Sequence, residues 1–142
     1  MSAWRSYVET YADLMAALEA DLAPTGLNLG DYQVLVYLSE TAERTLRMCD
    51  LAVRLQLSPS GLTRRLDGLV RTGLVERRPS DTDRRVMLAA LTPAGMTLLE
   101  QSAPIHVDSV RRRMIDLLDQ SELAVLASVF RKVRDALEEC PG

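Results

Sequence analysis

The sequence is poor in cysteine and histidine, with two cysteines and one histidine in 142 residues. Cys49 and Cys140 lie far apart and form no CxxC pair, which argues against a disulfide framework and a zinc knuckle. His106 has no second histidine or cysteine at the spacing of metal ligands. We therefore expect no bound metal, and we interpret His106 as a hydrogen-bonding residue on a helix face.

Long hydrophobic runs are also missing. No segment approaches the roughly 18 consecutive apolar residues of a membrane span. The N-terminal segment is amphipathic and lacks the charged stretch followed by an apolar one that marks a secretory signal. We expect a soluble, cytoplasmic protein with no membrane partner.

The elements of catalysis that can be recognised in a sequence are absent as well. There is no nucleophile with a base at a characteristic spacing, no glycine-rich phosphate loop and no cluster of carboxylates in an apolar setting. We expect a protein that is not an enzyme and that uses no cofactor.

What the sequence does contain suits a single globular domain. Its length lies within the usual range for one domain, and 47% hydrophobic and 26% charged residues are typical of a soluble chain with a core. A helical chain of this size has a high ratio of surface to volume and often completes its burial by pairing with a second copy. We expect an oligomer.

The charge is distributed unevenly along the chain. The formal net charge is -3, but residues 44–85 carry ten arginines and five acidic residues, whereas residues 1–43 carry one arginine and seven acidic residues. A basic middle third between acidic flanks is typical of a local nucleic-acid contact, because the position of the charge matters more than its total. Arginine also pairs well with phosphates and guanine edges.

The first part of the chain predicts two helices. Over residues 3–22, apolar side chains recur every three or four residues and acidic ones lie opposite, which indicates an amphipathic helix. Pro24 and Gly26 end this helix, and a second apolar helix begins near Gly30.

The central segment predicts a pair of short helices separated by a tight turn. Residues 45–47 are expected to be extended and residues 48–55 helical. Ser58 followed by Pro59 begins the second helix, because serine caps a free N–H and proline loses no hydrogen bond in the first turn. Gly73 ends it in a left-handed conformation.

A β-hairpin is expected directly afterwards. Two short strands, Leu74–Arg77 and Val86–Leu91, are joined by the polar residues 78–85, which form a charged tip. The predicted fold is therefore mainly α with a small β-hairpin wing, a winged helix-turn-helix domain flanked by helices at both ends.

The last third of the chain predicts two further helices. Thr92 and Pro93 cap one that runs to about Leu118. Pro104 is expected to kink or interrupt it, since an interior proline removes one hydrogen bond and crowds the preceding turn. The last helix is expected over residues 121–138, beginning at Ser121 and carrying an apolar stripe.

The central helix pair has the chemistry of a DNA reader. The major groove of DNA is about 12 Å wide and admits one helix. Ser60 and Gly61 would let the backbone approach a phosphate, and Arg64 would reach a phosphate or a guanine edge. An arginine at the tip of the hairpin would enter the narrow minor groove, where the negative potential is deepest.

The segment from Leu46 to Gly95, LRMCDLAVRLQLSPSGLTRRLDGLVRTGLVERRPSDTDRRVMLAALTPAG, resembles the MarR (multiple antibiotic resistance regulator) family of winged helix-turn-helix regulators. The run SPSGLTR from Ser58, the GLV ending from Gly73, and DRR from Asp83 followed by Thr92 and Gly95 stand at the family's spacing. The flanking helices match the family's dimerisation helices in length and position.

The resemblance implies a homodimer that binds a pseudo-palindromic site in double-stranded DNA and represses a neighbouring gene. It places the dimerisation helices in residues 1–29 and 98–142 and the DNA-binding lobe in residues 30–97 of one domain, 1–142. By motif position, it assigns DNA contacts to Ser60, Thr63, Arg64, Arg84 and Arg85. Asp83 matches the wing acid that holds the arginine in place.

The resemblance also implies an effector, a small aromatic or phenolic molecule bound between the dimer helices and the DNA-binding lobe. The candidates for lining this site are Trp4, Tyr7, Tyr11 and Tyr32. Core or interface packing is the simpler interpretation of the three residues on the first helix.

Several alternatives stay open. The chain is either a DNA-binding regulator or a small-molecule-binding or protein-interaction dimer that no longer reads DNA specifically. Arg111, Arg112 and Arg113 are interpreted as a solvated or salt-bridged surface rather than a DNA contact. Cys49 is interpreted as a half-buried structural residue, with a reactive thiol as the alternative.

Overall fold

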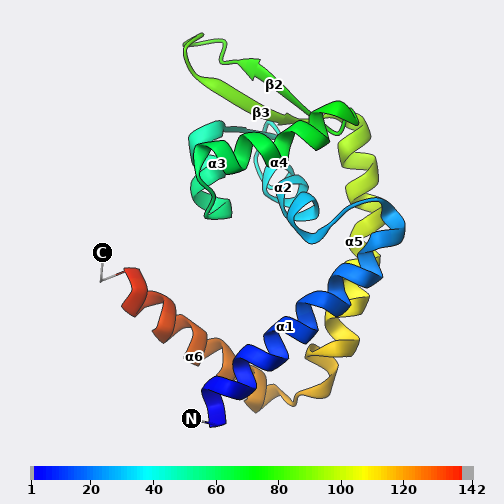
Figure 1. Cartoon of the computed structure of the whole chain (residues 1–142), viewed down its shortest axis with the longest axis vertical. Helices are drawn as coiled ribbons and strands as arrows, with labels where there is room; N and C mark the ends of the chain where they lie inside the picture. Colours follow the sequence, from blue (N-terminus) through cyan, green and yellow to red (C-terminus); the bar gives the residue numbers. More distant parts are fainter. Residues whose placement is uncertain (1, 139–142) are drawn as a thin grey trace. The chain divides into compact units, whose positions relative to one another are not determined.

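The computed structural model describes residues 2–138, so Cys140 lies outside the described residues. The chain divides into two units, Met1–His106 and Val107–Gly142. The first unit contains the two helices predicted for the start of the chain, the central helix pair, the hairpin and the first part of the helix that follows it (Figure 1). Its elements are α1 (Ser2–Leu22), the 3-10 turn η1 (Ala23–Thr25), α2 (Leu29–Ser39), β1 (Thr45–Arg47), α3 (Met48–Leu55), α4 (Pro59–Arg71), β2 (Val75–Pro79), β3 (Met87–Leu91) and the first part of α5 (Pro93–Arg113).

The predicted helix-turn-helix is formed by α3 and α4. Between them Gln56 adopts the left-handed conformation with φ of 54°, and the N–H of Leu57 donates to the carbonyl of Ala52 at 2.9 Å. Ser58 then caps α4, since its Oγ accepts from the N–H of Gly61 at 3.1 Å. The cap and the proline at the first turn confirm the predicted start of this helix.

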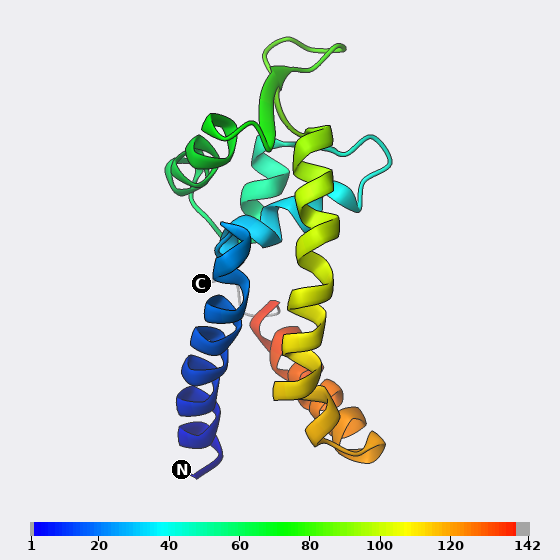
Figure 2. The same cartoon turned by 90° about the vertical axis from the view of Figure 1, so that its right-hand side faces the viewer.

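A three-stranded antiparallel sheet carries the hairpin. The strand order is β1-β3-β2, with Thr45 opposite Ala90 and Arg78 opposite Leu88. β2 begins one residue and ends two residues later than the sequence predicts, and β3 begins one residue later and ends at Leu91 as predicted. Figure 2 shows the hairpin loop projecting beyond the helices of this unit. Gly73, with φ of 75°, makes the predicted left-handed exit from α4 into β2.

The core of the first unit lies where the helices meet the sheet. Its side chains come from the helices α1 to α5 and from the three strands, and α4 contributes Leu62, Leu66 and Leu69. These three leucines are at most 2% exposed. Burying one face of α4 in this way leaves the opposite face to the solvent, and the burial of three leucines stabilises the arrangement by about 1.5–3 kcal/mol each.

The second unit consists of the end of α5, the 3-10 turn η2 (Ile115–Leu117) and α6 (Gln120–Glu138). The prediction that one helix runs to Leu118 is wrong, because the α-helix ends at Arg113 and the tighter turn follows. Pro104 lies inside α5, yet the helix is not interrupted. A missing N–H at one position removes a single hydrogen bond, and the neighbouring turns hold the helix together.

α6 begins at Gln120, one residue before the predicted start at Ser121. Asp119 is its cap, because its Oδ1 accepts from the N–H of Glu122 at 2.9 Å. Glu122 returns the interaction, accepting from the N–H of Asp119 at 2.8 Å. This reciprocal pair is a capping box, which satisfies two free N–H groups at the start of the helix.

Most of the exposed large apolar side chains among the described residues lie on α1 of the first unit and α6 of the second. On α1, Trp4 is 69% exposed and Tyr11 52%, and on α6, Val125 is 63% and Val133 52% exposed. Exposed apolar patches of this kind mark sites of association. No helix between residues 2 and 138 combines the length and the apolar character needed to cross a membrane.

Candidate nucleic-acid interface

The exposed face of α4 presents the side chains that the sequence assigns to base and phosphate contacts. Ser60, Thr63 and Arg64 are all exposed. Thr63 Oγ1 donates to the carbonyl of Pro59 at 3.0 Å, which fixes the hydroxyl against its own helix. The Arg64 guanidinium has no hydrogen bond or ion pair to any residue in the range 2–138 and points its donors at solvent. It is therefore available to a ligand of opposite charge.

Arg77 of β2 ties this helix to the wing. Its Nη2 donates to the backbone carbonyl of Thr63 and to Asp67 Oδ1, both at 2.8 Å. The Arg77 side chain is only 27% exposed. The contact joins α4 to the first strand of the hairpin, so the helix and the hairpin keep a fixed relation to each other.

We expect the substitution Arg77→Gln to lower the free energy of unfolding by about 1–2 kcal/mol, because two charge-assisted hydrogen bonds are lost and the carboxylate of Asp67 loses its partner. Urea denaturation followed by circular dichroism measures the change. The matched control is Arg78→Gln, which removes the exposed neighbour on the same strand and is expected to change the free energy by less than about 0.5 kcal/mol. Equal effects of the two substitutions would contradict a stabilising role for the Arg77 contacts with Thr63 and Asp67.

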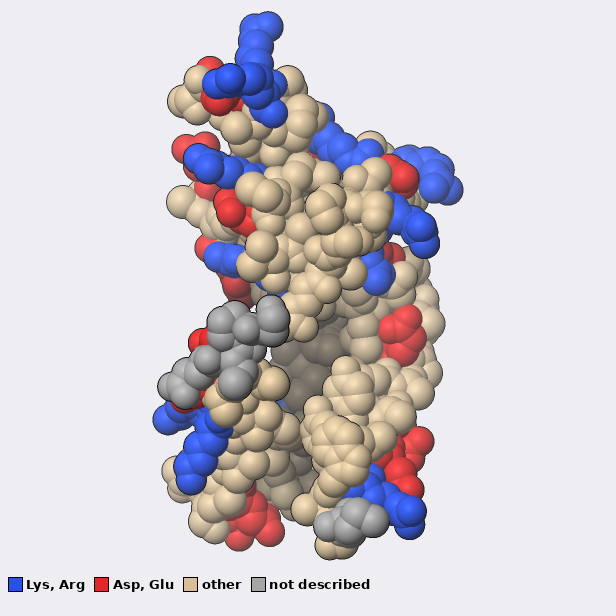
Figure 3. All heavy atoms as spheres, turned by 60° about the vertical axis from the view of Figure 1, so that its left-hand side comes forward, with Lys and Arg blue, Asp and Glu red and all other residues tan. Residues whose placement is uncertain are grey.

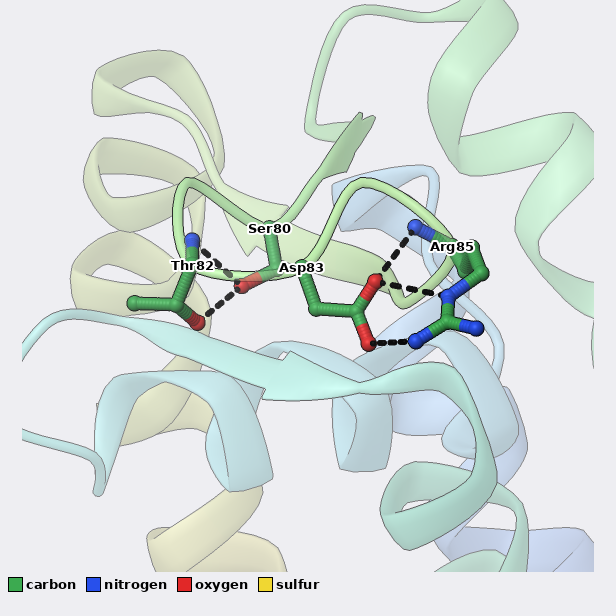
Figure 4. A network of polar contacts seen from close by, with 4 residues as sticks. All are labelled: Ser80, Thr82, Asp83 and Arg85. Atoms are coloured by element: carbon green, nitrogen blue, oxygen red, sulfur yellow. Dashed lines mark hydrogen bonds and ion pairs between the residues drawn. The ribbon is translucent and has the colours of Figure 1, made fainter.

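The tip of the wing is ordered by an interaction between Asp83 and Arg85 (Figure 4). Asp83 Oδ1 accepts from Arg85 Nε at 3.1 Å and from its backbone N–H at 3.0 Å, and Oδ2 accepts from Arg85 Nη2 at 3.3 Å. Across the loop, the Ser80 and Thr82 hydroxyls lie 3.0 Å apart and the N–H of Thr82 donates to Ser80.

These contacts set the charge state of the wing. Hydrogen bonds from Arg85 hold the pKa of Asp83 below its usual value of 3.8, and the nearby Arg47 guanidinium acts in the same direction. Asp83 is thus ionised at neutral pH and orients Arg85, whose side chain is 91% exposed. The structure brings Asp83 and Arg85 together, and Arg84 is exposed beside them.

Basic side chains gather at the hairpin end of the first unit. In Figure 3 they project from its top, where the wing lies. The arginines at the end of α5 are arranged differently, as predicted. Arg111 is paired with Asp116 at 3.1 Å, Arg112 with Asp108 at 3.2 Å, and Arg113 donates to Ser109 at 3.3 Å. These three charges are satisfied locally.

The candidate effector residues fall into two groups. On α1, Trp4, Tyr7 and Tyr11 form a row with successive ring centroids 5.9 Å apart. Tyr32 of α2 is 9% exposed and its ring lies 4.6 Å from that of His106 on α5. Burial raises the pKa of Tyr32 and lowers that of His106. Both side chains are therefore neutral at physiological pH.

The prediction that His106 is hydrogen-bonded is wrong at one of its two ring nitrogens. Nδ1 is buried and has no hydrogen-bond partner among the described residues. The ring is held by its contact with Tyr32 instead. Cys49 also differs from the interpretation as a half-buried residue, since it is exposed and its Sγ lies 3.8 Å from Asp50 Oδ1. Within residues 2–138 no group of histidine, cysteine and carboxylate side chains is placed to hold a metal ion.

Sequence reasoning missed two arginines. The contacts of Arg77 were not predicted and Arg65 was not singled out, yet Arg65 Nη1 donates to Asn28 Oδ1 at 3.0 Å. Nothing in the local sequence reveals either contact, because the partners are 14 and 37 residues away. The sequence does contain one signal for Arg65. It follows the apolar Leu62 by three residues, and positions three apart are neighbours on a helix surface, so Arg65 lies beside the buried face.

Comparisons with known proteins agree with this geometry. A model of the MarR family matches residues 25–86. The chain is 29% identical to the HTH-type transcriptional repressor YetL of Bacillus subtilis over 119 residues, covering 82% of this chain and 71% of that protein. Two crystal structures of MarR family regulators from Streptomyces coelicolor are closely similar. AbsC has a TM-score of 0.94 at 37% identity, covering 98% of this chain and 94% of AbsC.

The second structure is Sco3205 in complex with DNA, with a TM-score of 0.91 at 34% identity, covering 95% of this chain and 85% of that one. A mainly helical fold with an exposed reading helix and an arginine-tipped wing defines a DNA-binding regulator. The chain belongs to the MarR family of transcriptional regulators, which are not enzymes.

Proposed function

We propose that two copies of this chain form a cytoplasmic homodimer that represses a neighbouring gene by binding a pseudo-palindromic operator, and that a small aromatic or phenolic effector releases it. The observation that carries the proposal is the joint presentation of two arginines. Arg64 stands without a protein partner on the exposed face of α4, and Arg85 is held by Asp83 at the tip of the wing.

The two arginines suit two different grooves. A helix with a free arginine and two short hydroxyl side chains fits the major groove, where a bidentate arginine recognises guanine. The wing arginine, on a loop beyond the helices, fits the minor groove beside it. Ser60 and Thr63 complete the contacts of α4, and Arg84 adds a phosphate contact. The DNA-bound structure of Sco3205 supports this assignment by similarity of fold.

The exposed apolar faces of α1 and α6 support a homodimer. Residues 1–29 and 98–142 contain these faces and would supply the dimerisation helices, and residues 30–97 would supply the DNA-binding lobe. A pair of lobes related by two-fold symmetry reads two half-sites in successive major grooves, about 34–36 Å apart. This symmetry is the reason for expecting a pseudo-palindromic operator.

The aromatic side chains support the proposed class of effector. Trp4, Tyr7 and Tyr11 offer ring faces on α1, and the ring of Tyr32 lies 4.6 Å from that of His106, whose buried Nδ1 has no hydrogen-bond partner among the described residues. A planar molecule with one polar group would stack on the rings and satisfy such an atom. Release from DNA requires that it bind the DNA-incompetent form of the dimer more tightly.

The test is a fluorescence-anisotropy titration of the purified protein against tiles of DNA from its own upstream region, at about 150 mM salt with nonspecific competitor. We expect saturable, nanomolar binding to one tile that contains an inverted repeat. Arg64→Ala should weaken this binding by about 1–3 kcal/mol and relax the preference for that tile, because one base contact is lost.

The matched control is Arg112→Ala, which removes an arginine that is already paired within the second unit. It should bind like the wild type. Uniformly weak binding of the wild type to all tiles, unchanged by Arg64→Ala, contradicts the proposal and favours a dimer that binds small molecules or proteins.

A further inference from the structure

Arg65 is the one arginine of α4 that turns toward the protein instead of the solvent. Its Nη1 donates to Asn28 Oδ1 at 3.0 Å and lies 3.6 Å from Asp31 Oδ1. The side chains of Arg65 and Asp31 are only 32% and 22% exposed. Arg65 therefore binds within the protein, whereas its neighbour Arg64 is exposed on the same helix.

The contact is built into the start of α2. Asn28 is the cap of that helix, and its Oδ1 accepts from the N–H of Asp31 at 2.7 Å as well as from Arg65. The N–H of Leu29 donates to Glu19 Oε2 of α1 at 2.8 Å. One short segment therefore joins α1, α2 and α4 through hydrogen bonds to charged or capping groups.

Gly30 provides the room for this contact. A Cβ atom on Gly30 would overlap the guanidinium of Arg65, so the group lies directly against the backbone of α2. The three atoms nearest to the Cβ position all belong to this guanidinium. A close fit of this kind fixes the position of the guanidinium in addition to its charge.

Arg65 and Asp67 anchor α4 on opposite sides. At 3.6 residues per turn, positions two apart lie about 200° around the helix. Arg65 is bound to α2, and Asp67 to Arg77 of β2 at 2.8 Å. The exposed face that presents Ser60 and Arg64 lies between the two anchors. Removing the Arg65 contact leaves α4 held by its buried leucines and by the Asp67–Arg77 contact on the other side, and apolar contacts are less directional than hydrogen bonds.

We propose that Arg65 is a positioning residue for operator recognition: bound to Asn28 and Asp31, it fixes the rotation of α4 about its own axis and so directs Arg64 at the bases. The inference rests on the proposed function, because it assigns to Arg65 the alignment of a helix that reads DNA. The two adjacent arginines of α4 then have different roles: Arg64 contacts DNA, and Arg65 holds α4 in the orientation that this contact requires.

The test compares operator and random DNA for the wild type, Arg65→Gln, Asp31→Asn and the double variant, by anisotropy at fixed salt. We expect each single substitution to lower the ratio of operator affinity to random-DNA affinity about tenfold, which is within the range for one misaligned base contact. The double variant should lose no more than either single variant, because both remove the same contact. Affinity for random DNA should not change.

The charge control is Arg54→Gln on α3, whose guanidinium is paired with Glu40 at 4.0 Å. This substitution removes one positive charge from the same unit and should leave the affinity ratio unchanged. If Arg65→Gln instead weakens operator and random DNA equally and flattens the salt slope by up to about two, for two copies in the dimer, Arg65 is a phosphate contact and the positioning role is wrong.

A second readout follows the carboxyl group itself. Burial raises the pKa of Asp31 above 3.8, the Glu19 carboxylate of α1 raises it further, and the Arg65 guanidinium of α4 opposes both. NMR titration of Arg65→Gln should show a further rise in this pKa. An unchanged pKa contradicts the contact in solution.

Two other outcomes are decisive. If Arg65→Gln fails to fold, Asp31→Asn, which keeps the shape of the side chain, decides on its own. A wild type that binds operator and random DNA alike overturns the proposed function, and the positioning role with it. A wild type that discriminates beside variants that discriminate equally well overturns the positioning role alone.

Discussion

Raising the salt concentration from 50 to 200 mM is expected to weaken operator binding by about 10³- to 10⁵-fold, the result for a dimer that neutralises roughly six to ten phosphates. Each bound arginine releases condensed counterions from DNA, and this release becomes less favourable as salt rises. The basic residues concentrated in the 44–85 segment, with Arg84 and Arg85 exposed on the wing, supply these contacts.

The measurement is the slope of log K against log salt, taken from anisotropy titrations at five or more salt concentrations. Arg84→Gln should flatten the slope by up to about two, since a dimer carries two copies and each phosphate contact accounts for about 0.9. Arg112→Gln, which removes an arginine paired with Asp108, should leave it unchanged. A wild-type slope flatter than about -2 would be incompatible with a DNA interface of this size.

The second large effect concerns α6. Val133 is 52% exposed in the single chain and lies in the middle of the apolar stripe of this helix. We expect Val133→Asp to raise the dissociation constant of the homodimer at least about 100-fold, because two unpaired carboxylates, one from each copy, would enter an apolar interface. Operator affinity should fall with it, since a monomer reads only one half-site.

Analytical ultracentrifugation over a range of protein concentrations measures the dissociation constant. Ser128→Asp is the control, because it places the same side chain on the polar face of the same helix. A homodimer that survives Val133→Asp, or that both substitutions weaken equally, would show that α6 does not contribute its apolar face to the dimer.

Local features of this protein could be predicted because their causes lie within a few residues. Ser58 and Pro59 begin α4, and Gly73 ends it, through contacts within one turn of the chain. The pairing of Asp83 with Arg85 spans two residues. One local signal was overlooked at α6. Asp119 and Glu122 stand at the spacing of a capping box, and with this cap the helix begins one residue before Ser121.

Features that depend on distant partners could not be predicted. His106 was expected to be hydrogen-bonded, but its surroundings are set by Tyr32, which arrives from another helix. The continuity of α5 through Pro104 depends in the same way on the whole helix. Proline removes one hydrogen bond, and the remaining hydrogen bonds of the helix keep it continuous.

The sequence by itself determined the family, the mainly helical fold with its wing, and the order of reading helix and hairpin, because helix periodicity, caps and turn residues act over short distances. Only the tertiary structure decided which arginines are free and which are bound. Arg64 and Arg65 are adjacent and chemically identical, yet one faces solvent and the other lies against Gly30, because burial of the leucine face of α4 brings position 65, and not position 64, next to α2. One residue along a helix is a turn of about 100°, and that angle separates the solvent-exposed side chain proposed to contact DNA from the one bound within the protein.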